Sequence, residues 1–156
     1  MLNLDTHILI LAINGELRRS EQAVLTRNPW SVSAIVLWEL AKLVQLKRLD
    51  MDLDDREVVR VLSRLHVWRI DLAVAQASTR LDFRGDPADE IIAATSVVHG
   101  VPLVTRDRIM RGSKVIPRLA SVLFARTWWR FGPEDSCWKK SMATREKATA
   151  SRSKRL

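Results

Sequence analysis

The sequence predicts one α/β domain in which a parallel sheet of four or five strands is flanked by helices on both faces. Short apolar runs of strand length alternate along the chain with longer stretches that have helical spacing. Two of these runs end at a carboxylate, Asp5 and Asp107. Because ligands of parallel sheets bind beyond the carboxyl ends of the strands, the same pattern places a candidate site. The length of 156 residues suits a single domain.

Each expected element is bounded by capping or turn-forming residues. The expected strands cover residues 1–5, 30–33, 67–70 and 102–105, with a short fifth strand considered at 114–116. The expected helices cover residues 8–13, 16–27, 34–46, 55–65, 72–81 and 87–99. The clearest helix has Asp86 as its N-cap, Pro87 at its first position and Gly100 as its stop. Further N-caps are expected at Ser33, Asp54 and Asp71.

The net charge of +8 is concentrated near the C-terminus. Residues 118–156 carry 10 Lys/Arg and 3 Asp/Glu, which leaves a net charge of +1 for residues 1–117. The overall charge is therefore weak evidence that the folded surface binds nucleic acid. We expect residues 1–117 to form the domain, and residues 118–156 to be a basic extension that is disordered at least from residue 141.

Cysteine usage and hydropathy indicate the compartment. The single cysteine, Cys137, excludes an intrachain disulfide and a cysteine-based zinc cluster. The apolar run at residues 8–13 is too short to cross a membrane or to act as a signal. The expected location is the cytoplasm, with no membrane partner.

Four acidic residues that lie far apart in the sequence are expected to converge on one pocket: Asp5, Glu39, Asp89 and Asp107. Asp5 and Asp107 follow strands, Glu39 lies on an apolar flank of a helix, and Asp89 lies near a helix N-terminus. Simpler interpretations exist for each residue. Asp5 and Asp107 could cap helices, Asp89 could complete a capping box with Asp86, and Glu39 could be a surface side chain.

A shared pocket for these acids predicts a bound cation. Carboxylates that crowd together raise one another's pKa, and a hard divalent ion resolves the conflict. Oxygen ligands favour Mg²⁺, with Mn²⁺ as a substitute. Asp5, Asp89 and Asp107 are the expected metal ligands, and Glu39 is expected to act through a bound water. Such a site suits phosphate-ester hydrolysis by a metal-activated water, so His7 is expected to be packed or edge-solvated rather than a general base.

Four segments around the acids share their pattern with a known family. They are Leu4-Asp5-Thr6, Trp38-Glu39-Leu40, residues 85–95 (Gly-Asp-Pro-Ala-Asp-Glu-Ile-Ile-Ala-Ala-Thr) and residues 103–107 (Leu-Val-Thr-Arg-Asp). The sequence resembles the PIN-domain nucleases, and within them the VapC toxins of bacterial type II toxin–antitoxin modules. The resemblance covers residues 1–117. It implies a PIN-like fold, magnesium-dependent cleavage of single-stranded RNA, and a homodimer neutralised by a cognate antitoxin.

The same resemblance implies catalytic roles for Asp5, Glu39, Asp89 and Asp107, with Thr105 as a supporting hydroxyl. One departure lies beside the third acid, because Glu90 stands where many relatives carry Arg. Arg84 or Arg106 would then have to supply the missing cation.

A second departure is the stretch of residues 118–156, which has no counterpart in the family pattern. We interpret it as functionally idle rather than as an RNA-contacting arm. A catalytically degenerate PIN-like module, which binds RNA or an antitoxin without cutting, is the alternative function. A phosphoacceptor signalling domain is disfavoured, because no second acid adjoins Asp5.

Overall fold

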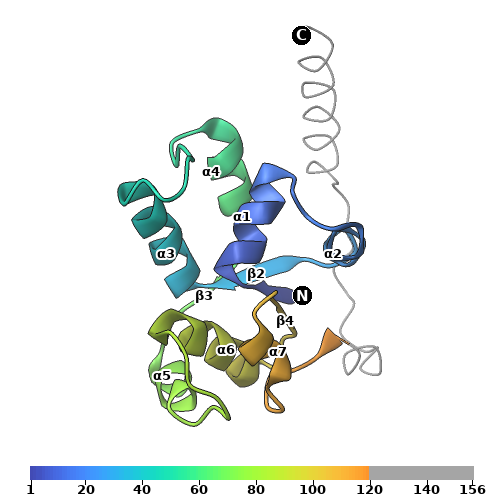
Figure 1. The fold of residues 1–156 in the computed structure, drawn as a ribbon, viewed down its shortest axis with the longest axis vertical. Helices are drawn as coiled ribbons and strands as arrows, with labels where there is room; N and C mark the ends of the chain where they lie inside the picture. The colour runs from blue at the N-terminus through green and yellow to red at the C-terminus, as the bar shows by residue number, and fades with distance from the viewer. Residues whose placement is uncertain (120–156) are drawn as a thin grey trace, which may run out of the picture. The chain divides into compact units, whose positions relative to one another are not determined.

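The computed structural model describes residues 1–119 and contains a parallel sheet with the strand order β3-β2-β1-β4. The strands are β1 (Leu2–Leu4), β2 (Trp30–Ser33), β3 (His66–Trp68) and β4 (Leu103–Val104). The helices are α1 (Thr6–Asn14), α2 (Arg19–Leu25), α3 (Ala34–Gln45), α4 (Arg56–Leu62), α5 (Leu72–Ser78), α6 (Pro87–His99) and α7 (Arg108–Gly112). Figure 1 shows α1, α3 and α4 on one side of the sheet and α5, α6 and α7 on the other. The predicted fold class is confirmed.

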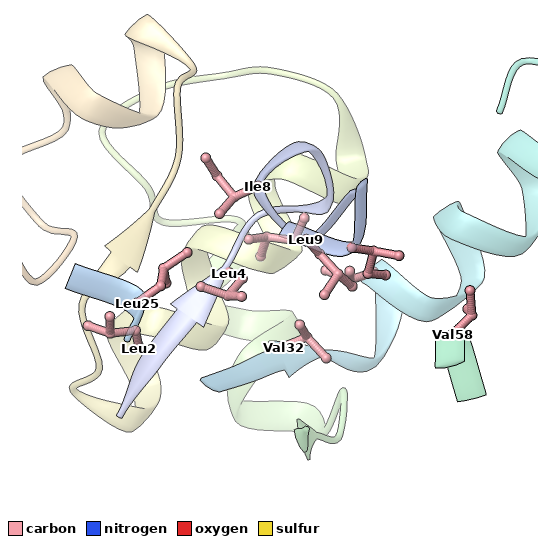
Figure 2. Close-up of a cluster of buried hydrophobic side chains, with 10 residues drawn as sticks. Leu2, Leu4, Ile8, Leu9, Leu25, Val32 and Val58 are labelled. Atoms are coloured by element: carbon pink, nitrogen blue, oxygen red, sulfur yellow. The ribbon is translucent and has the colours of Figure 1, made fainter. Parts of the chain in front are cut away.

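One face of the sheet is packed by aliphatic side chains. Leu2 and Leu4 alternate along β1, and they pack with Ile8 and Leu9 of α1, as Figure 2 shows. Leu25, Val32 and Val58 bring α2, β2 and α4 into the same cluster. Removing a buried leucine from such a cluster costs roughly 2–5 kcal/mol, so this face holds β1 and α1 rigidly in place.

The opposite face of β1 and β2 is polar and hydrogen-bonded to α6. Asn3 is fully buried, and its Nδ2 donates to Ile92 O at 3.1 Å and to Ser96 Oγ at 2.9 Å. Thr95 Oγ1 lies 3.0 Å from Ser33 Oγ on β2. Because an unmade buried hydrogen bond is costly, these contacts set one register of α6 against the sheet. The N-terminus of α6, which carries Asp89, is thereby placed relative to the end of β1.

Two local expectations are wrong. Residues 114–116 form no strand within the described chain. The backbone N of Lys114 donates to the side chain of Asp82, to Oδ2 at 2.7 Å, and is not available to a neighbouring strand. The N-cap of α4 is Asp55 rather than Asp54, since Asp55 Oδ1 accepts from Glu57 N at 2.8 Å. The expected caps of α5 and α6, by contrast, are confirmed.

The apolar sequence around Trp38 predicts that this side chain lies in the core, but the structure leaves it 56% exposed. The buried positions of α3 are Val36 and Leu40, which leaves Trp38 between them on the outer side of the helix. Trp68 is partly buried on the edge strand β3, where its ring stacks on His99 with 3.9 Å between centroids. Within residues 1–119, no helix has both the length and the apolar character needed to cross a bilayer.

Candidate functional site

Asp5 follows β1 at the edge of the sheet where the strands end. Its backbone N donates to Val104 O at 3.1 Å, so Asp5 lies directly beside the end of β4. The residue is only 7% exposed, and Thr105 Oγ1 donates to its Oδ2 at 2.7 Å. Burial raises the pKa of Asp5, although the hydrogen bond from Thr105 and the charge of His7 lower it. The Asp5 carboxylate is therefore held where a nearby cation would stabilise it.

Glu39 reaches the same region from α3. Its Oε2 accepts a hydrogen bond of 2.6 Å from Thr6 Oγ1, the residue next to Asp5. Burial raises the pKa of Glu39, and the charges of Asp5 and Asp86 raise it further. Glu39 is thus electrostatically coupled to Asp5 rather than being an isolated surface side chain. Sequence reasoning missed the contact with Thr6, for which adjacency to Asp5 was the only local signal.

Asp89 does not serve as the cap of α6. Asp86 Oδ1 accepts from Ala88 N at 2.9 Å, and Glu90 Oε1 accepts from Gly85 N at 3.1 Å, so these two residues make the terminal contacts. Burial raises the pKa of Asp89 to about 6, together with the charges of the surrounding acids. Those acids, in decreasing order of effect, are Asp5, Glu39, Asp107 and Asp86. Asp89 is therefore within electrostatic range of the other three predicted acids.

Asp107 lies between β4 and α7 and has a structural role of its own. Its Oδ1 accepts from Met110 N at 2.9 Å and caps α7, as the simpler interpretation of this residue proposed. Its backbone N donates to Thr105 Oγ1 at 3.0 Å. The hydroxyl of Thr105 therefore links the Asp5 carboxylate to the backbone of Asp107.

Neither arginine that could have replaced the missing cation points to the acids. Arg106 donates to Glu21 through Nε at 2.8 Å and through Nη2 at 2.7 Å. Arg84 donates to Thr79 O at 3.2 Å. His7 is exposed, and a positive charge on this side chain lowers the pKa of both Asp5 and Glu39.

The donor chemistry of this cluster fits a hard divalent cation. The side chains are all carboxylates, and burial together with their mutual repulsion raises the pKa of Asp89 to about 6. In the conformation described for residues 1–119, no group of three His, Cys, Asp or Glu side chains is arranged to hold an ion directly. Direct binding by three of these groups therefore requires at least one acidic side chain to rotate toward the ion.

Comparison with known proteins identifies the family of this chain. The PIN domain family model matches residues 3–112. The chain belongs to the PIN domain family. One curated relative of this PIN domain is Ribonuclease VapC22 of Mycobacterium tuberculosis, which is 32% identical over 99 residues. The match spans 61% of this chain and 75% of that relative.

Solved structures support the same PIN fold. A VapBC2 complex from Rickettsia felis, bound to a DNA fragment of its promoter, matches with a TM-score of 0.57 at 21% identity, over 74% of this chain and 96% of that chain. The DNA-bound VapBC complex from Salmonella typhimurium also gives a TM-score of 0.57, at 23% identity, over 76% and 97%. The recognition of a VapC-like PIN domain from the four sequence segments is confirmed.

Proposed function

We propose that this PIN domain is a magnesium-dependent endoribonuclease toxin that cleaves single-stranded RNA and is neutralised by a cognate antitoxin. The observation that carries the proposal is the placement of the acids: hydrogen bonds from Thr105 and Thr6 hold Asp5 and Glu39 at the strand ends, and burial together with the charges of the surrounding acids raises the pKa of Asp89 to about 6. The relative named Ribonuclease VapC22 supports the reaction class, and the VapBC complexes among the structural neighbours support an antitoxin partner. The homodimer stays a prediction, which light scattering of the purified chain tests.

We assign different roles to the side chains of such a site. We assign metal binding to Asp5, Asp89 and Asp107, and orientation of an attacking water to Glu39. When bound, Mg²⁺ would polarise a phosphoryl oxygen and lower the pKa of a bound water. Thr105 orients Asp5 through its hydroxyl, and Thr6 orients Glu39 in the same way. These two hydrogen bonds hold the carboxylates in defined directions before substrate arrives.

A cleavage assay tests the proposal. The purified chain, separated from any antitoxin, is incubated with Mg²⁺ and RNAs that expose single-stranded loops. We expect cleavage that EDTA abolishes, that Mn²⁺ supports, and that Asp5→Asn lowers by at least about a hundredfold. Asp54→Asn is the matched control, because Asp54 is an exposed acid on the loop before α4. Cleavage that survives EDTA, or equal cleavage by the Asp5 and Asp54 variants, contradicts the proposal.

A second candidate is a catalytically degenerate module that binds RNA or an antitoxin without cutting. The observation that favours it concerns Glu90, which accepts from Gly85 N and brings a negative charge where many relatives carry Arg. Neither Arg84 nor Arg106 replaces that cation. The same assay separates the two functions, because the degenerate module would shift RNA in a gel while producing no Mg²⁺-dependent fragments.

A further inference from the structure

The loop between β4 and α7 is tied to α2 by one ion pair. Arg106 donates to both carboxylate oxygens of Glu21, at 2.8 Å to Oε1 and 2.7 Å to Oε2. This two-point contact is geometrically more specific than a single-point pair. Both partners are mostly shielded, with side-chain exposures of 31% for Arg106 and 15% for Glu21. The pair spans 85 positions of sequence and is not a local helix contact.

The position of Arg106 in the loop gives this ion pair its significance. Thr105 and Asp107, which flank it, both belong to the acidic site, through the hydrogen bond to Asp5 and the charge that acts on Asp89. The hydrogen bonds of this loop direct its side chains differently: Arg106 bonds to Glu21 of α2, whereas Thr105 bonds to Asp5 and to the backbone N of Asp107. If Arg106 is held on the α2 side, Thr105 and Asp107 are held on the side of the acids.

Glu21, the other partner of the ion pair, is held in place by α2. Glu21 Oε2 also accepts from Arg18 N at 2.8 Å, which ties the carboxylate to the start of α2. At the other end of α2, Leu25 is buried in the aliphatic cluster of the sheet. Hydrogen bonds from Arg106 lower the pKa of Glu21 to about 2, so its carboxylate stays ionised throughout the physiological range. The Glu21–Arg106 ion pair is therefore present throughout this pH range and is not a pH-dependent switch. We call this ion pair the brace.

We propose that Glu21 and Arg106 are positioning residues, which hold Thr105 and Asp107 in the geometry that the metal-binding acids require. This inference rests on the proposed function of the same site. In this role Arg106 is not the cation that compensates for Glu90. It acts through its neighbours, and Glu21 keeps it away from the acids.

The test measures the affinity of the purified full chain for Mn²⁺ alone, by electron paramagnetic resonance, and then kcat and KM on an RNA that the wild type cleaves. Glu21→Gln and Arg106→Gln are each expected to weaken Mn²⁺ binding and to lower kcat, both on the order of tenfold, with KM little changed. The double variant should be no weaker than either single variant, because both remove one interaction. The matched control is Glu57→Gln, which breaks the Glu57–Arg60 pair on α4.

Several outcomes overturn the proposal. One is Mn²⁺ affinity and kcat of Glu21→Gln that equal those of Glu57→Gln. Another is a raised KM in Arg106→Gln alone, which would make Arg106 a direct RNA contact. If Glu21→Gln does not fold, as its melting temperature reports, Glu21→Asp replaces it: this side chain keeps the charge but is too short for both contacts, and wild-type Mn²⁺ affinity contradicts the brace.

The failure of the brace is distinguishable from failure of the proposed function. If the wild type binds Mn²⁺ and cleaves RNA while the Glu21 variants match it, only the brace is wrong. If the wild type binds no Mn²⁺, the metal site itself is wrong, and the brace is wrong with it. If the wild type binds Mn²⁺ without cleaving RNA, the Mn²⁺ titrations alone decide on the brace.

Discussion

Replacing Asp89 by Asn should stabilise the metal-free protein at neutral pH. The carboxylate of Asp89 is partly buried among the charges of other acids, and its pKa is raised from 3.8 to about 6. Asn has nearly the same shape and no charge, so the substitution removes the repulsion and leaves the packing in place. A stabilising substitution at a functional position is expected where like charges are held together for binding.

The magnitude and its pH dependence follow from the pKa of Asp89. Because the folded protein binds this proton more tightly than the unfolded chain does, the free energy of unfolding of the wild type falls as pH rises from about 4 to about 6. The full difference between the two pKa values corresponds to at most about 3 kcal/mol. Solvent screening of a partly exposed side chain reduces this, and we expect a gain of about 1 kcal/mol for Asp89→Asn.

Urea unfolding in EDTA, at about pH 7.5 and about pH 4, measures this gain. The variant should exceed the wild type at the higher pH and match it at the lower one, where Asp89 is protonated. Asp54→Asn, the same change at an exposed acid, controls for a general effect of charge. A variant that is no more stable than the wild type at about pH 7.5 refutes the clustering of the acids around Asp89.

Three further predictions concern single hydrogen bonds of the site and its supports. Asp86→Ala removes the cap of α6 and should lower the free energy of unfolding by about 1 kcal/mol in urea titrations, whereas Asp86→Asn should retain most of it. Thr105→Val removes the donor to Asp5, so the pKa of Asp5 should rise further and kcat/KM for RNA should fall on the order of tenfold, with recovery in Thr105→Ser. Asn3→Ala leaves Ser96 Oγ and Ile92 O without their buried donor and should cost about 1–3 kcal/mol by the same urea titration; a loss no larger than that of an exposed Asn→Ala change, at Asn14, contradicts the assigned role.

Local patterns in the sequence predicted most of the fold. Asp86-Pro87 at one end of α6 and Gly100 at the other are chemical signals that act within a few residues, and both boundaries are confirmed. The prediction of a fifth strand at residues 114–116 was wrong. The backbone N of Lys114 donates to the carboxylate of Asp82, which lies 32 positions earlier in the sequence, and not to a neighbouring strand. The prediction that Trp38 is buried was wrong, because the hydrophobicity of this side chain does not reveal that Val36 and Leu40 already fill the buried side of α3.

The candidate site was likewise predictable where the signal is local and not where it depends on a contact between distant residues. Strand-end placement predicted that Asp5 and Asp107 lie at one edge, and the pairing of β1 with β4 brings Asp5 directly beside Val104. The pairing of Arg106 with Glu21 was not predictable, since nothing near either residue indicates a partner 85 positions away. Spacing left Arg106 available to the acids, and only the folded geometry assigns it to α2.

The strongest argument that the acids act together is that local structure does not need most of them. Asp5 stands at the N-cap position of α1 without a capping hydrogen bond to its side chain, and the backbone N–H groups of Thr6 and His7 lower its pKa less than burial raises it. Asp86 and Glu90 make the terminal contacts of α6, so Asp89 is not required there. Of the four predicted site acids in the described chain, only Asp107 caps a helix through its side chain. An arrangement that raises the pKa of Asp89 destabilises the metal-free protein, and none of these local roles offsets that cost. A bound cation would offset it, which is why we interpret the cluster as a binding site and not as a by-product of helix capping.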